Sequence, residues 1–406
     1  MKRIAEATER ALGPETAKAT AVLRLLFIIE NDQPHAAAGG CYAIYKFGEF
    51  LARRGHSVHI YGVHDMHWVR TDANLSLSFR PNLPRRGRIL TKLDRMLSRF
   101  GERWLLPRTI RRLRPDWILG FLTYSAIKAE ALGRSFRVPV ANFVYECPPW
   151  MREVYGEEMF RNFADPFTRR LWDSTRRAYL GSRILFPNSA LSREYNSGWL
   201  DGKTVAEPIH PGIDPEQMPY QAPETEPVRL DISRKHLLFV GRLVKSKHVD
   251  DLIAASRRLD HAVELHVCGS GPEMAGLKSQ AAGSPFIHFH GFVSDGDLWS
   301  LFRQCDLVVY PTEFEGFGMP PMQALYFGKP CLASDLAIFR SVFGDRLEYF
   351  PLGQVADLTA AIERLLGNPG YCRRRGEEGR QFVLEHFTWA RAAETIERTL
   401  ADAPQA

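Results

Sequence analysis

The segment from Pro311 to Asp335 combines a carboxylate, a glycine-rich turn and a helix start at short spacing. It reads PTEFEGFGMPPMQALYFGKPCLASD, so we expect a strand to end at Thr312, a turn around Glu315 and a helix from about Pro320. Backbone N–H groups and the positive end of such a helix attract phosphates and other anions. A carboxylate beside them can accept hydrogen bonds from sugar hydroxyls. The alternative is a tight turn in which the glycines serve only the backbone geometry.

Apolar runs of strand length alternate with helical segments in the first half of the chain. VLRLLFII at 22–29 precedes the polar loop NDQPHAAAGG, a helix expected from about Cys41 to Arg54, and the strand SVHIYGV at 57–63. This order of strand, helix and strand is a βαβ unit, which requires a parallel sheet. Three further strands are expected, in RPDWILGF (114–121), VPVANFVY (138–145) and RILFPNS (183–189).

The same alternation begins again after a proline-rich, acidic connection at 206–227. Strands are expected in HLLFVGRL (236–243), VELHVCG (263–269), FIHFHGF (286–292), DLVVYPT (306–312) and KPCLASD (329–335), with a helix near Val249 to Leu259. A chain of 406 residues is long enough for two hydrophobic cores. The predicted organisation is an extension at 1–20, a first domain at 21–205, a second domain at 206–385 and a final helix within 386–406.

Charge is distributed unevenly between the two halves. The net charge is +6, but residues 1–200 contain 32 Lys+Arg and 19 Asp+Glu (32 − 19 = +13), and residues 201–406 contain 21 and 28 (21 − 28 = −7). The densest basic stretch, Arg85 to Arg114, also has an apolar helical face. That face consists of Leu93, Met96, Leu97, Phe100 and Trp104. It indicates either a helix packed on the core or a surface that contacts anionic lipid or a lipid-linked acceptor.

Other sequence features bound the class of protein. No apolar run approaches the ~20 residues that a membrane-spanning helix needs, and residues 1–13 lack the pattern of a secretory signal. The six cysteines are dispersed without a C-x-x-C pair, which favours reduced thiols over a disulfide framework or a zinc site. No nucleic-acid-binding module accompanies the basic charge. We therefore expect a cytoplasmic protein, with a peripheral location on the inner face of the cell membrane as an option.

Several short motifs in a fixed order resemble family 4 of the retaining glycosyltransferases. They are a Gly-Gly loop at 39–40, LARRGHSV (51–58), RPDWI (114–118), HPGID (210–214), VGRLVKSKH (240–248), CGSGPE (268–273), HGFVSDGDL (290–298) and EGFGMPPMQAL (315–325). The joint order and spacing make the resemblance specific, and it covers nearly the whole chain after residue 20. It implies the GT-B fold, in which two Rossmann-like, doubly wound parallel-sheet domains face each other across a cleft that holds the donor.

The resemblance also implies roles for individual residues. Arg242 and Lys247 match the basic pair that binds the donor diphosphate, where negative charge grows as the anomeric C–O bond breaks. Glu315 matches an acid that contacts donor sugar hydroxyls. The other matched substrate-binding positions are Gly39, Gly40, Gly241, Val293, Gly316, Phe317, Gly318 and Met319. The alternatives are solvated loop charges for the two cations, ordinary turns for the glycines of the first loop, and a packed strand end for Val293.

Two positions depart from the family pattern. The second acid of the family's acid pair should fall at 315 + 8 = 323, where this chain has Gln323, which we expect to bind the ribose more weakly by about 1 kcal/mol. In FVYECPPW (143–150), Glu146 replaces a histidine that meets the donor sugar. As a candidate catalytic residue, Glu146 either accepts a sugar hydroxyl or pairs with an arginine of the first domain. His35 and His210 are further candidates for the site.

The sequence is thus interpreted as that of a retaining hexosyltransferase in polysaccharide biosynthesis. It would move a sugar from a UDP-, GDP- or ADP-linked donor to a glycan or lipid-linked acceptor, with no metal ion and no cofactor beyond the donor substrate. The alternative is a catalytically degenerate family member that binds nucleotide sugar or scaffolds a glycan-assembly complex.

Overall fold

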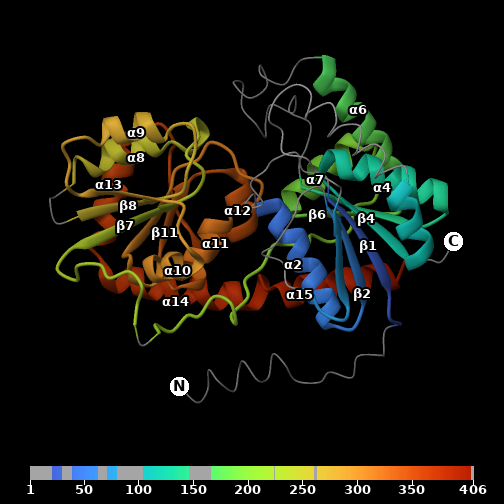
Figure 1. The fold of residues 1–406 in the computed structure, drawn as a ribbon. Coiled ribbons are helices and arrows are strands. Elements are labelled where there is room, and N and C mark those ends of the chain that lie inside the picture. The colour runs from blue at the N-terminus through green and yellow to red at the C-terminus, as the bar shows by residue number, and fades with distance from the viewer. Residues whose placement is uncertain are drawn as a thin grey trace, which may run out of the picture.

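The described part of the chain contains two six-stranded parallel sheets flanked by helices (Figure 1). This computed structural model describes residues 21–29, 39–62, 71–79, 104–145, 166–223, 225–259 and 263–403. Within these ranges the predicted α/β fold with two doubly wound parallel sheets is confirmed. No helix in the described part of the chain is both long enough and apolar enough to cross a membrane.

The first sheet has the strand order β3-β2-β1-β4-β5-β6, and all neighbouring strands are parallel. Its strands are β1 (Arg24–Ile29), β2 (Ser57–Gly62), β3 (Leu75–Phe79), β4 (Trp117–Phe121), β5 (Val140–Val144) and β6 (Ile184–Pro187). Its helices are α2 (Gly39–Arg53), α4 (Leu122–Phe136), α6 (Pro166–Gly181) and α7 (Ala190–Trp199), and residues 104–113 are also helical. Successive β1 side chains alternate between two cores, which explains why this strand is apolar throughout.

The second sheet has the order β12-β11-β10-β7-β8-β9. Its strands are β7 (Lys235–Val240), β8 (Val263–Cys268), β9 (Ile287–Gly291), β10 (Leu307–Tyr310), β11 (Cys331–Ser334) and β12 (Glu348–Phe350). Its helices are η1 (Lys245–Lys247), α8 (Val249–Ser256), α9 (Met274–Gln280), α10 (Asp295–Gln304), α11 (Met319–Tyr326), α12 (Ala337–Phe343), η2 (Gly344–Arg346), α13 (Val355–Leu366) and α14 (Pro369–His386). The strand order reverses between β7 and β10, and ligands of such sheets bind at the carboxyl ends of the strands beside that point.

Two observed strands were not predicted, and the predicted basic helix is described only in part. β3 and β12 were not predicted, and each lies at an edge of its sheet. In the predicted basic helix, residues 85–103 lie outside the described residues. In the described turns at 104–113, Leu106 and Ile110 are buried while Trp104 and Leu105 are about half exposed. This segment therefore packs on the core through one side and also presents apolar groups to solvent.

The last helix, α15 (Trp389–Ala401), returns to the first sheet (Figure 1). Trp389 is buried among the residues of α2, with its ring edge-on to Phe47 at 5.5 Å and to Tyr42 at 5.9 Å. The neighbouring Lys46 is 1% exposed and its Nζ lies 3.2 Å from Asp214 Oδ2, in the connection between the two sheets. The ring contacts hold α15 against the first domain, and the ion pair holds the connection there.

Candidate functional site

The loops that follow β7 and β10 are joined at the carboxyl edge of the second sheet. The Glu313 N–H donates to the Ser246 carbonyl at 3.0 Å, and Thr312 Oγ1 lies 3.1 Å from the same oxygen. The Thr312 N–H is held in turn by Ser334 Oγ at 2.8 Å. The two motifs that the sequence analysis singled out, at 240–248 and 311–319, therefore form one surface.

Lys247 and Glu315 are brought together at this surface. Lys247 Nζ forms an ion pair with Glu315 Oε1 and a hydrogen bond to Thr312 Oγ1 at 3.1 Å. The Tyr310 hydroxyl donates to the same Glu315 oxygen, and Lys247 Nζ lies 5.3 Å from the centre of the Tyr310 ring. Burial, and then the negative charge of Glu315, raise the pKa of Tyr310 well above its usual value. Tyr310 therefore remains a protonated donor that fixes the carboxylate.

The second predicted cation, Arg242, lies on the same loop five residues before Lys247. Its side chain is exposed and makes no hydrogen bond or ion pair with any residue in the described ranges. The backbone beside it is tightly packed, because the Gly241 N–H donates to the Cys268 carbonyl and a side chain at Gly269 would overlap the Gly241 carbonyl. The Arg242 side chain is thus open to solvent, and its backbone is held by the packing beside it.

A run of unpaired amides follows Glu315. Within the described part of the chain, the N–H groups of residues 316–319 donate no hydrogen bond. Gly318 is the N-cap of α11 with φ of 100°, a conformation that favours glycine. Pro320 and Pro321 have no N–H to add, so the anion-binding capacity of this helix end is concentrated in residues 316–319.

The remaining predicted donor contacts lie on neighbouring elements. Val293 follows β9 and packs partly buried against the core of the second domain. Gln323 is on α11, partly exposed, in the turn after Met319. Phe317 is buried and contacts the rings of His210 and Phe387 at centroid distances of 5.7 and 5.5 Å. Phe317 therefore serves the packing of the loop, and only its backbone is placed to meet a ligand.

The first domain contributes the opposite wall of a pocket at Glu315 and Gly316. The lining residues are Tyr145, Asn188, Ser189, Leu191, Ser192, Tyr195, Asn196, Phe314, Glu315, Gly316 and Ile338. Asn188 Nδ2 donates to the Gly316 carbonyl at 2.7 Å, and the Asn188 carbonyl lies 2.7 Å from His210 Nδ1. Burial lowers the pKa of His210. His210 therefore acts as a neutral support behind the pocket.

For the remaining predicted site residues, the structure gives only the element or no description. Gly39 and Gly40 are the first two residues of α2. Glu146 and His35 lie outside the described residues. Sequence reasoning missed Tyr310, Thr312 and Asn188, although each ends a buried strand or follows one within two residues, which is the position that a doubly wound sheet uses for its ligands.

Comparisons with known proteins find a family match within the second domain. Residues 224–382 match the family model described as glycosyl transferases group 1. A glycogen synthase of Mycobacterium tuberculosis is 30% identical over 198 residues, which are 46% of this chain and 45% of that protein. A GDP-mannose-dependent alpha-(1-6)-phosphatidylinositol dimannoside mannosyltransferase of the same species is 30% identical over 168 residues, 40% of this chain and 43% of that protein. The chain thus spans less than half of the length of these two relatives.

Solved structures share the fold of both domains. Sucrose-phosphate synthase from Thermosynechococcus elongatus superimposes with a TM-score of 0.77 at 18% identity, over 92% of this chain and 97% of that one. Anabaena HepE, solved in complex with UDP and glucose, gives 0.71 at 16% identity, over 94% of this chain and 100% of that one. The whole chain therefore has the GT-B fold, and its residues 224–382 match the glycosyl transferases group 1 family.

Proposed function

We propose that this protein is a hexosyltransferase that takes a sugar from a nucleotide-diphosphate donor and transfers it with retention of the anomeric configuration. The observation that carries the proposal is the convergence of Lys247, Glu315 and the unpaired amides of residues 316–319 on one edge of the second sheet. Cations and amides bind a diphosphate, and a carboxylate held beside them binds the hydroxyls of the attached sugar.

The proposed chemistry depends on charge that develops during the reaction. The anomeric C–O bond to the diphosphate breaks, a bond to the acceptor oxygen forms on the same face, and the acceptor proton passes to a departing phosphate oxygen. Lys247 and Arg242 stabilise the leaving diphosphate more than the intact donor, because its negative charge increases. Thr312 and Glu315 hold Lys247 in place beforehand, which removes part of the reorganisation that the reaction would otherwise require.

The same residues give the expected orientation of the donor. The base would lie towards Val293, the ribose towards Gln323 and the sugar towards Glu315, with Gly241 allowing close approach of the diphosphate. Gly39, Gly40 and Glu146 would contribute from the first domain. UDP, GDP and ADP are all candidates for the donor nucleotide. UDP is supported by the UDP complex of Anabaena HepE and GDP by the name of the mannosyltransferase relative.

For the acceptor we propose a glycan or a lipid-linked sugar, reached from the pocket wall of the first domain. A peripheral contact with anionic membrane is supported by Trp104 and Leu105, which are 49% and 48% exposed, and by the guanidinium of Arg108 at 5.2 Å from the Trp104 ring. Cosedimentation with phosphatidylglycerol vesicles tests this contact. Equal binding by the wild-type protein and a Trp104→Ser, Leu105→Ser variant would remove it from the proposal.

Turnover of UDP-, GDP- and ADP-linked sugars by wild-type protein and two lysine variants tests the function. Lys247→Ala is expected to lower turnover by about a hundredfold, because at least one charge-assisted hydrogen bond of about 1.5–3 kcal/mol is lost. Lys245→Ala removes the same charge from an exposed position two residues away, and we expect it to retain turnover. Similar rates for all three proteins, or no turnover of any donor by the wild type, would contradict the proposal.

Two further measurements test the stereochemistry and the metal requirement. ¹H NMR of the first-formed product is expected to show the anomeric configuration of the donor, and the opposite configuration would exclude retention. The positive charge at the diphosphate comes from Arg242 and Lys247, so we expect a chelator to leave the initial rate unchanged.

A further inference from the structure

One face of the second sheet carries four histidines and a glutamate on three adjacent strands. His236 is on β7, Glu264 and His266 are on β8, and His288 and His290 are on β9. The register pairs His236 with Glu264 and His266 with His288. Because side chains two residues apart on a strand share a face, all five point to the same side of the sheet.

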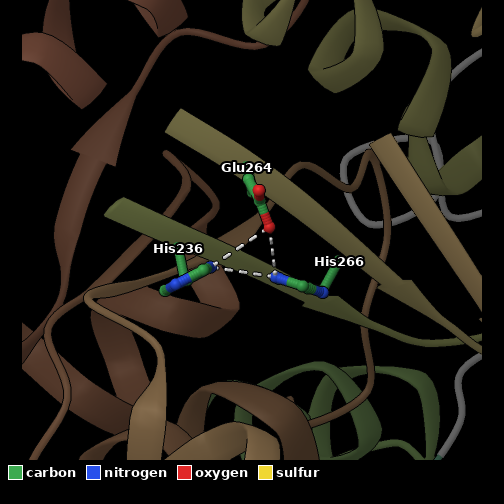
Figure 2. Close-up of side chains that lie close together, drawn as sticks. All are labelled: His236, Glu264 and His266. Atoms are coloured by element: carbon green, nitrogen blue, oxygen red, sulfur yellow. Dashed lines mark hydrogen bonds and ion pairs between the residues drawn. The ribbon is translucent and has the colours of Figure 1, made fainter. Parts of the chain in front are cut away.

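Three of these side chains converge on one point (Figure 2). His236 Nδ1 and His266 Nε2 are 3.0 Å apart. Glu264 Oε2 lies 3.8 Å from the first nitrogen and 3.9 Å from the second. A tetrahedral Zn²⁺ bound at 2.0–2.1 Å holds its ligand atoms about 3.4 Å apart, so the three separations bracket the spacing that the ion requires.

The hydrogen-bond and ion-pair partners of these three side chains suit side chains that bind a metal ion. His236 Nε2 lies 2.9 Å from the Asp231 carbonyl, which can only accept, so the ring proton is on Nε2 and the Nδ1 lone pair faces the cluster. His266 Nδ1 is 3.0 Å from His290 Nε2. A metal-bound histidine almost always donates its other ring N–H to a carboxylate, a backbone carbonyl or water, and His236 has such a partner in the Asp231 carbonyl. The second carboxylate oxygen of Glu264 is held by Arg234 Nε at 3.2 Å.

Access and burial also suit a bound ion. The side chains of His236 and His266 are 3% and 4% exposed, whereas Glu264 is 16% and His288 38% exposed. β9 is the edge strand, so the solvent route runs past His288. His288 Nε2 lies 3.2 Å from Glu264 Oε2 without forming a hydrogen bond. His288 Nε2 therefore lies beside the three ligand atoms. Water can take the fourth position of the ion.

We propose that His236, Glu264 and His266 bind a divalent transition-metal ion of the zinc class, which links β7 to β8. Two imidazoles and one carboxylate form a ligand set that zinc accepts. His236 is five residues before Gly241 along β7, which corresponds to about 17 Å at the strand rise. The ion would therefore stabilise the second domain at a distance from the donor diphosphate and would not take part in sugar transfer.

The test uses the full chain without a polyhistidine tag, stripped with a chelator and returned to metal-free buffer. Calorimetric titration with ZnCl₂ is expected to give one ion per chain with a dissociation constant in the micromolar range or below. Zinc should also raise the melting temperature, because it binds the folded state. Zinc X-ray absorption of the wild-type complex is expected to show nitrogen and oxygen ligands only.

Two conservative variants locate the site. Glu264→Gln should weaken zinc binding at least tenfold and abolish the zinc-dependent rise in melting temperature. His248→Gln removes a ligand from the other cluster of possible ligands in the described residues, His248 with Asp250 and Asp251, and should leave zinc binding unchanged.

Three results would overturn the proposal. The first is a wild-type chain that takes up no zinc at one equivalent, which would leave the histidines as a purely hydrogen-bonded row. The second is a sulfur ligand near 2.3 Å, which would assign the ion to cysteine. The third is loss of binding in His248→Gln but not in Glu264→Gln. The absorption spectrum of the wild type decides the ligand set even if Glu264→Gln does not fold.

Discussion

Gly269→Ala tests whether the packing of the second-domain loops controls turnover. Gly269 follows β8 with φ of +131°, a backbone conformation that side chains rarely adopt. A Cβ at this position would overlap the carbonyl oxygen of Gly241, which is backbone and cannot rotate away. The two loops must therefore separate by roughly 1 Å, and Arg242 and Lys247 move with the loop that follows β7. A misplacement of about 1 Å costs about a hundredfold in rate.

Gly283→Ala is the matched control for this prediction. Gly283 also has a positive φ, of +80°, but a Cβ there meets nothing within 4 Å. Both variants should lose about 1–3 kcal/mol of stability from backbone strain, measured by urea unfolding. Only Gly269→Ala should also lose about a hundredfold in kcat/KM for the nucleotide sugar. If both variants keep the same kcat/KM while Gly269→Ala remains folded, the loop separation does not control the site and the reasoning is wrong.

Three further predictions concern stability, pH and the pocket. Lys46→Met removes the buried and nearer of the two cations at the Asp214 carboxylate and leaves Arg53 at 4.0 Å, so the free energy of unfolding should fall by about 3 kcal/mol; a loss below about 1 kcal/mol in denaturant titration would contradict this. Burial and then Arg112 lower the pKa of His59 from 6.5 to about 4. The unfolded chain thus binds a proton more readily than the fold, and stability is lost as the pH falls below 6.5. Between pH 7 and pH 4 the wild type should lose about 3 kcal/mol more than His59→Gln, and parallel pH profiles would exclude this role. Asn188→Ala removes the hydrogen bond to the Gly316 carbonyl and should lower kcat/KM about tenfold; an unchanged kcat/KM would show that this bond does not position the turn.

The sequence predicts most of the fold because its strands are buried on both faces. β1 and β7 contain continuous apolar runs of five and four residues, and the polar turns after them are equally clear. β3 has the sequence LSLSF, in which apolar and polar residues alternate, and β12 has only three residues. Edge strands need less apolar sequence because one side has no neighbour, so the hydrophobic pattern that finds central strands misses them.

Part of the site was predicted from short motifs in the sequence. Lys247 and Glu315 could be named because both lie in motifs of specific spacing, and the structure brings them into contact. Tyr310 was not predicted because its role depends on a hydrogen bond from its hydroxyl to Glu315, which lies five residues later, beyond the end of the strand. The convergence of His236 with His266 depends on the register of β7 with β8, and spacing along a chain does not reveal register.

The central claim is that Lys247 and the amides after Glu315 bind the diphosphate of a nucleotide sugar. Calorimetric titration of UDP, GDP and ADP into wild-type protein and into Lys247→Ala tests it most directly. We predict that at least one of the three binds the wild type and that the variant binds it at least tenfold more weakly, as loss of one charge-assisted hydrogen bond requires. Equal affinity of a bound diphosphate for both proteins, or no binding to the wild type, would contradict the account.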